Sequence, residues 1–260
     1  MDLVTAAAMG GLTPAAFAAA LAITMFAGFV KGAIGFAMPL IMISTFAAFM
    51  PPPMALAALI LPTLATNLQQ AFRQGAGAAW ESVYRFRRMI AMLVIFIAIS
   101  AQFVLSIPSW LLLGVLGVPL TAFAVVQLLG MDLRLQLRHR KGAEYVLGGI
   151  GGFYGGISGV WGPPVIIYLV SVGAEKRETV RVQGVVYLIG AIMLLASHLH
   201  SGVLNADTLR LSAVLCVPAM LGLWVGFVLQ DRLDPLRFRR WTLVLLAITG
   251  LNLVRQAIFG

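Results

Sequence analysis

The chain has 260 residues, of which 61% are hydrophobic and only 10% are charged. This composition excludes an ordinary soluble domain, in which about half of the residues are apolar and about a quarter are charged. The net charge of +9 would suit nucleic-acid binding, but the basic residues lie in short loops between apolar runs, as the positive-inside rule describes for membrane proteins. Because those runs are continuous and about 20 residues long, we predict an all-α integral membrane protein that binds no nucleic acid.

The first predicted element is a helical hairpin over residues 14–50, with arms at 14–30 and 39–50. Glycines interrupt the apolar run between the arms, and Pro39 suits the first turn of a new helix. The prolines at 51–53 form a turn after this hairpin. Three membrane-spanning helices are then predicted at 54–72, 89–107 and 110–129, with a basic loop at 73–88 between the first and the second.

The second half of the chain repeats this plan. A second hairpin is predicted at 144–173, with arms at 144–154 and 163–173, followed by spans at 182–199, 209–230 and 241–258. We therefore divide the chain into a first repeat (1–130), a basic linker (131–144) and a second repeat (145–260).

The two hairpins share a motif at an offset of 124 residues, from position 28 to position 152. The matching residues are Gly28, Phe29, Gly32, Gly35 and Pro39 in the first hairpin and Gly152, Phe153, Gly156, Gly159 and Pro163 in the second. Helices that break at matching places in two halves of a chain indicate the binding site of a transporter.

The distribution of positive charge predicts the topology. The linker at 131–144 and the loop at 174–181 are both basic, so both are expected in the cytoplasm. The hairpin between them must then enter and leave on the same side, as a re-entrant hairpin whose arms are shorter than the ~20 residues of a full span. The first hairpin, or pair of tilted spans, is expected to enter from the outside.

This topology places fifteen of the eighteen basic residues in the cytoplasm. A hairpin plus three spans makes an odd number of crossings, so we predict two inverted repeats, with both termini on the outer side of the membrane.

Lys31 lies inside the first hairpin, whereas all nine acidic residues lie in loops or at the edges of spans. A charge at membrane depth is a functional hypothesis by default, although a lysine near a helix end can also snorkel to the interface. The starts of the helices near Met38 and Gly162 would add positive dipole ends. We therefore expect a small anionic substrate, and neither a metal nor a cofactor.

Two predicted spans carry polar residues at helical spacing: Thr63, Asn67, Gln70 and Gln74 on one, and Gln183 and Tyr187 on the other. Hydrogen bonding between helices is the alternative role for each of them. The predicted substrate-binding residues are Lys31, Gly32, Gly35, Met38, Asn67, Gln70, Gly156, Ser158, Gly159, Trp161, Gln183 and Tyr187.

Residues 156–159 also match the GxSG pattern of rhomboid-type intramembrane serine proteases, with His198 or His200 as a candidate base. However, Ile34 stands where the first hairpin should repeat Ser158, so the repeat preserves the glycines and not a nucleophile. We predict that the protein is not an enzyme and has no catalytic residue.

These features together resemble the sulfite exporter TauE/SafE family, also called the four-toluene-sulfonate uptake permease family. The resemblance is carried by the two glycine-rich breaks, by residues 66–75 and by the two-half layout, over about residues 14–258. It implies secondary transport of a sulfur-containing anion, such as sulfite, sulfoacetate or another organosulfonate, across a bacterial inner membrane. Export is expected rather than uptake.

An anion channel that uses the same breaks as a filter is the alternative function. A proton is the candidate coupling ion, carried by a weakly acidic substrate or by Lys31, and transport without coupling is also open. The expected partners are the substrate and the lipid bilayer, for a monomer or a homodimer.

Overall fold

Every regular element is helical in the computed structural model, which describes residues 10–131, 134–135, 139–230, 232 and 234–260. The helices are, in chain order, α2 (Pro14–Ile34), α3 (Met38–Phe46), α4 (Pro52–Phe72), α5 (Ala76–Arg85), α6 (Arg87–Ser100), the 3-10 turn η1 (Ala101–Phe103), α7 (Ser109–Leu128), α8 (Arg140–Ser158), α9 (Gly162–Ser171), α10 (Lys176–Ser201), α11 (Ala206–Leu229) and α12 (Pro235–Phe259). This confirms the predicted all-α membrane fold.

Six of the described helices are long and apolar enough to cross a membrane: α2, α4, α7, α10, α11 and α12. Helices α5 and α6, the latter with η1, form a pair that is bent by 81° at Phe86. The sequence suggested only a loop at 73–88, because the short helix α5 carries mixed polar and apolar residues in place of an apolar run.

The first break in the apolar run is shorter than the sequence indicated. Helix α2 continues through Lys31 to Ile34 and ends at Gly35, whose φ of 87° is left-handed and whose N–H donates to the carbonyl oxygen of Lys31 at 2.7 Å. After Ala37, which is also left-handed at φ 77°, helix α3 begins with Pro39 in its first turn. With 21 residues, α2 has the length of a full span, not of a short arm.

The second break has the same local geometry, 124 positions later. Helix α8 ends at Gly159 with a φ of 72°, and the N–H of Gly159 donates to the carbonyl oxygen of Gly155 at 2.7 Å. Helix α9 then begins with Gly162, Pro163 and Pro164. In both hairpins, the last glycine of the shared motif ends the first helix in a left-handed conformation, which glycine adopts without steric strain.

The other motif glycines pack helices together. Cβ atoms built at Gly28 and Gly32 would collide with the backbone of α11, and Cβ atoms built at Gly152 and Gly156 would collide with the backbone of α6. Small residues at such spacing allow two membrane helices to approach closely. The first arm of each hairpin thus packs on a helix from the other half of the chain: α2 packs on α11, and α8 packs on α6.

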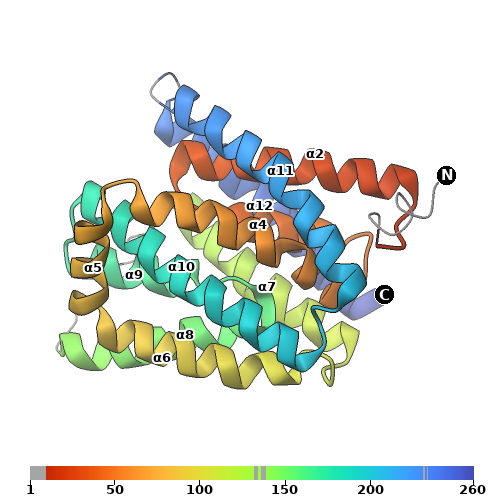
Figure 1. The fold of residues 1–260 in the computed structure, drawn as a ribbon, viewed down its shortest axis with the longest axis horizontal. Coiled ribbons are helices and arrows are strands. Elements are labelled where there is room, and N and C mark those ends of the chain that lie inside the picture. The colour runs from red at the N-terminus through yellow and green to blue at the C-terminus, as the bar shows by residue number, and fades with distance from the viewer. Residues whose placement is uncertain (1–9, 132–133, 136–138, 231, 233) are drawn as a thin grey trace.

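Helices α4 and α10 lie side by side between the α2–α11 pair and the α6–α8 pair (Figure 1). Their apolar windows are each 67% buried, compared with 33–39% for the other candidate spans. Polar residues on α4 and α10, such as Thr63, Asn67 and His198, are therefore buried inside the molecule.

Pro62 lies inside α4 and leaves one backbone carbonyl of that helix without its usual donor. A side chain of α11 supplies the missing hydrogen bond. A proline cannot donate to the carbonyl four residues before it, and here the hydroxyl of Ser212 donates to that oxygen, on Ala58, at 3.1 Å. The same hydroxyl accepts from the N–H of Leu61 at 3.0 Å. Backbone groups at membrane depth need such internal partners.

Candidate functional site

Lys31 lies inside the molecule, one helical turn before the break at Gly35. Its side chain is buried, with the residue only 2% exposed, and its ammonium donates to Thr66 Oγ1 at 2.8 Å and to Asn67 Oδ1. Among the described residues, no carboxylate forms an ion pair with it. Two neutral side chains therefore solvate a buried cation whose charge stays uncompensated within the described part of the chain.

The polar face of α4 joins the first break to α10. Asn67 Nδ2 donates to the backbone oxygen of Tyr187 at 3.0 Å. One turn later, Gln70 Nε2 donates to the carbonyl oxygens of Gly35 at 3.1 Å and of Val180 at 3.4 Å. The interhelical hydrogen bonding that was the alternative role for Asn67 and Gln70 is thus present, and it links α4 to α10 beside Lys31.

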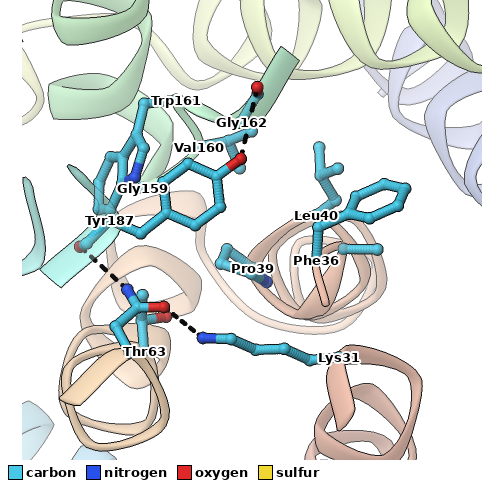
Figure 2. A pocket seen from close by; sticks show the side chains of 12 residues that line it. Lys31, Phe36, Pro39, Leu40, Thr63, Gly159, Val160, Trp161, Gly162 and Tyr187 are labelled. Atoms are coloured by element: carbon cyan, nitrogen blue, oxygen red, sulfur yellow. Dashed lines mark hydrogen bonds between the residues drawn. The ribbon is translucent and has the colours of Figure 1, made fainter. Parts of the chain in front are cut away.

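A small pocket, with a cavity volume of about 30 Å³, lies beside Lys31. It is lined by Lys31, Phe36, Ala37, Pro39, Leu40, Thr63, Asn67, Gly159, Val160, Trp161, Gly162 and Tyr187. Figure 2 shows the lysine side chain extending from α2 toward Thr63 on α4, with Pro39 and Leu40 on a second side and the rings of Trp161 and Tyr187 on a third. The lining is mostly apolar, so the ammonium and a few polar groups decide which ligand fits.

The start of α3 lies beside this pocket, which Ala37, Pro39 and Leu40 line. No side chain caps α3, and Pro39 has no N–H, so the first-turn N–H groups of Met38 and Leu40 lack an intrahelical partner. The start of α9 is also uncapped, but Pro163 and Pro164 remove two donors there. The sequence predicted a positive helix end at both breaks. The start of α3 has more free N–H donors than the start of α9.

Thr63 is a pocket residue that the predicted set omitted. Thr63 is fully buried and lines the pocket, and its Oγ1 has no hydrogen-bond partner. A buried hydroxyl without a partner is unfavourable unless a ligand or water completes it. Its position one turn before Asn67 on the polar face of α4 was the signal that could have included it.

The predicted site residues divide into three groups. Those that line the pocket are Lys31, Asn67, Gly159, Trp161 and Tyr187. Those that lie in direct contact with the pocket residues or the breaks are Gly35, Met38, Gln70 and Ser158. The remaining three lie elsewhere, since Gly32 and Gly156 pack against neighbouring helices and Gln183 is buried on α10 outside the lining.

Ser158 and His198 have separate hydrogen-bond partners. The hydroxyl of Ser158 donates to the carbonyl oxygen of Tyr154 at 2.7 Å and accepts from the N–H of Val160 at 3.0 Å, which caps the end of α8. His198 Nε2 lies 2.9 Å from the carbonyl oxygen of Gly156, and its Nδ1 lies 3.2 Å from Ser201 Oγ. Each side chain thus holds a helix end, and the two are not arranged as a nucleophile and its base.

Comparison with known proteins identifies a family for the chain. The model of the family described as sulfite exporter TauE/SafE matches residues 20–253, which include both helix breaks and every residue of the Lys31 pocket. Searches of curated proteins and of solved structures found no match. On the strength of the family match, which covers nearly the whole chain, the protein belongs to the sulfite exporter TauE/SafE family of membrane transporters.

Proposed function

We propose that this protein is a secondary transporter that moves a small sulfur-containing anion, such as sulfite, sulfoacetate or another organosulfonate, by alternating access. The family membership supports an anion of this class. The observation that carries the proposal is the buried ammonium of Lys31, which faces a pocket and has no carboxylate partner among the described residues. An anionic guest would supply the missing charge.

The donors around the pocket suit a tetrahedral oxyanion. Lys31 has three N–H donors, of which two are used by Thr66 and Asn67. The third N–H of Lys31 remains for a ligand. Together with the hydroxyl of Thr63 and the free N–H groups at the start of α3, it could donate to several sulfonate oxygens at once. The organic part of a sulfonate would then contact Trp161 and Tyr187, whose rings pack edge to face at 6.3 Å.

The position of the pocket suits alternating access. Its lining comes from α2, α3 and α4 in the first half of the chain and from α9, α10 and the second break in the second half. A movement of the halves against each other would open the pocket first to one side of the membrane and then to the other. We propose inverted repeats as the geometry of this movement, with export as the working direction.

Counterflow in proteoliposomes tests the proposal. Vesicles that contain the purified protein are loaded with unlabelled sulfoacetate, and isotope-labelled sulfoacetate is added outside. A transporter should accumulate the label transiently above equilibrium, because the outward gradient of unlabelled substrate drives exchange. The variant Lys31→Met should lose this accumulation, whereas Arg210→Gln, at an exposed position on α11, should keep it.

The same vesicles separate a transporter from a channel. A channel would pass anion current along the electrochemical gradient and would show no counterflow. Equal fluxes of sulfoacetate in protein-containing and protein-free vesicles, with sulfite tested in parallel, would contradict the proposed substrate class.

A further inference from the structure

Helices α6 and α8 leave an apolar groove on the outer surface, separate from the Lys31 pocket. It is an open groove of about 520 Å³ and is lined by Met92 and Phe96 from α6 and by Tyr145, Val146, Gly149, Ile150, Phe153 and Tyr154 from α8. None of these residues lines the Lys31 pocket. The proposed transport cycle gives this groove no role.

The groove exists because glycines bring α8 close to α6 and leave space beside the contact. Cβ atoms built at Gly148 and Gly152 would collide with the backbone of Met89 and Leu93, so these glycines form the contact itself. At the adjacent Gly149, a Cβ would lie 3.4 Å from the ring of Phe96, with room remaining in front of that ring. The groove is thus open and apolar, as a site for a hydrocarbon chain requires.

Basic residues stand at one end of the groove. Lys141 precedes Tyr145 by four residues on α8, and Arg88 precedes Met92 by four residues on α6, so each lies one helical turn beyond the groove on a lining face. Arg87 and Arg140 adjoin them. Lys141 and Arg140 form no ion pair within the described residues.

Within the described residues, the carboxylate of Glu144 pairs with one of these four cations. Glu144 lies 3.4 Å from Arg88 and accepts a hydrogen bond from Tyr168 at 2.8 Å. The Arg88–Glu144 contact also shows that the N-terminal ends of α6 and α8 meet at this end of the groove. The end of the groove therefore keeps an excess of positive charge.

We propose that this groove is a binding site for an anionic phospholipid. Its acyl chain lies along α6 and α8, and its phosphate contacts Lys141 and Arg140. Basic clusters between membrane helices bind anionic headgroups in this way. A second copy of the chain suits the groove less well, because a twofold pairing would bring two basic clusters of the same sign together.

Native mass spectrometry and thermal unfolding of the full chain in detergent test the proposal, with dioleoyl phosphatidylglycerol and dioleoyl phosphatidylcholine as probes. The protein should retain phosphatidylglycerol, and this lipid alone should raise the melting temperature. The double variant Arg140→Gln/Lys141→Gln and the groove-filling variant Gly149→Leu should each reduce the retained phosphatidylglycerol several-fold. The matched controls Arg239→Gln/Arg240→Gln and Ala213→Leu change exposed residues on α12 and α11 and should retain it.

Three results would overturn the assignment: equal retention of the two lipids, unchanged retention after Arg140 and Lys141 are neutralised, or a dimer that Gly149→Leu dissociates. If Gly149→Leu fails to fold, the double variant decides the outcome, since it alters only exposed side chains. Neither variant touches the Lys31 pocket, so the result is independent of the proposed transport function.

Discussion

The ammonium of Lys31 donates a hydrogen bond to the amide oxygen of Asn67, and the amide nitrogen of Asn67 donates at 3.0 Å to the backbone oxygen of Tyr187. One neutral side chain thus connects the buried charge on α2 with the helix α10 of the other half. Because Asn67 is neutral, it orients the ammonium without cancelling its charge. An acid at this position would have cancelled it.

The variant Asn67→Asp tests this point. A carboxylate beside Lys31 should form an internal ion pair and compete with any anionic ligand, so the affinity for sulfoacetate should fall at least tenfold, or about 1.4 kcal/mol. Titration of the ligand-induced rise in melting temperature measures this change. Asn67→Leu is the control, since it should lower the melting temperature of the unliganded protein by leaving Lys31 and Tyr187 with fewer partners. Unchanged sulfoacetate affinity in Asn67→Asp would contradict an anion site at Lys31.

The unpaired hydroxyl of Thr63 predicts a direct ligand contact. Thr63→Val keeps the shape of the side chain and removes the donor, so the affinity for sulfoacetate should fall by about tenfold or more, as is usual for the loss of one hydrogen bond to a charged group. Thr63→Ser should retain most of the affinity. Because the hydroxyl has no protein partner, the unliganded melting temperature should not fall in Thr63→Val, and a large fall would assign Thr63 a structural role instead.

The left-handed glycines predict a graded loss of stability. Alanine is disfavoured by about 1–2 kcal/mol at such backbone angles, so Gly35→Ala and Gly159→Ala should both lower the melting temperature. Gly159→Ala should have the larger effect, since its Cβ would lie 2.6 Å from Leu59 Cδ1 whereas Gly35 has open space. Gly77→Ala, in ordinary helix α5 with no atom nearby, is the control and should be neutral or stabilising. An equal effect of all three substitutions would mean that the breaks are not held in this geometry.

Ser158→Ala separates the transport account from a protease. The substitution removes the hydroxyl that accepts from the N–H of Val160, so we expect a loss of about 1 kcal/mol in stability. Sulfoacetate counterflow should continue at a comparable rate. Complete loss of function in a folded Ser158→Ala protein would point to a chemical role for the hydroxyl.

The sequence predicted the existence of both breaks but could not distinguish the glycine that ends a helix from those that pack it. Gly28, Gly32 and Gly35 all belong to the same motif, yet only Gly35 is left-handed, while the other two contact α11. Which role a glycine takes depends on a helix almost 200 residues away, and no local pattern contains that information. Gly156 likewise takes its packing role from a helix outside its own motif, α6.

The charge at the site was easier to predict than its polar partners. A lysine in an apolar run without acids is visible in the sequence itself, and the structure does place Lys31 against the polar face of α4. The hydroxyl of Thr66 accepts a hydrogen bond from Lys31 and donates one to the backbone oxygen of Pro62 at 2.7 Å. A threonine in a helix commonly makes that local bond, so its second role appears only when α2 packs on α4.

The most direct measurement of the central claim is equilibrium binding of sulfoacetate to the purified protein by isothermal titration, with Lys31→Met and Lys31→Arg compared at matched folding. If the ammonium is the counter-charge of the transported anion, Lys31→Met should show no measurable binding, and Lys31→Arg, which keeps the charge, should retain part of it. Binding by folded Lys31→Met with the affinity of the unmodified protein would contradict the account.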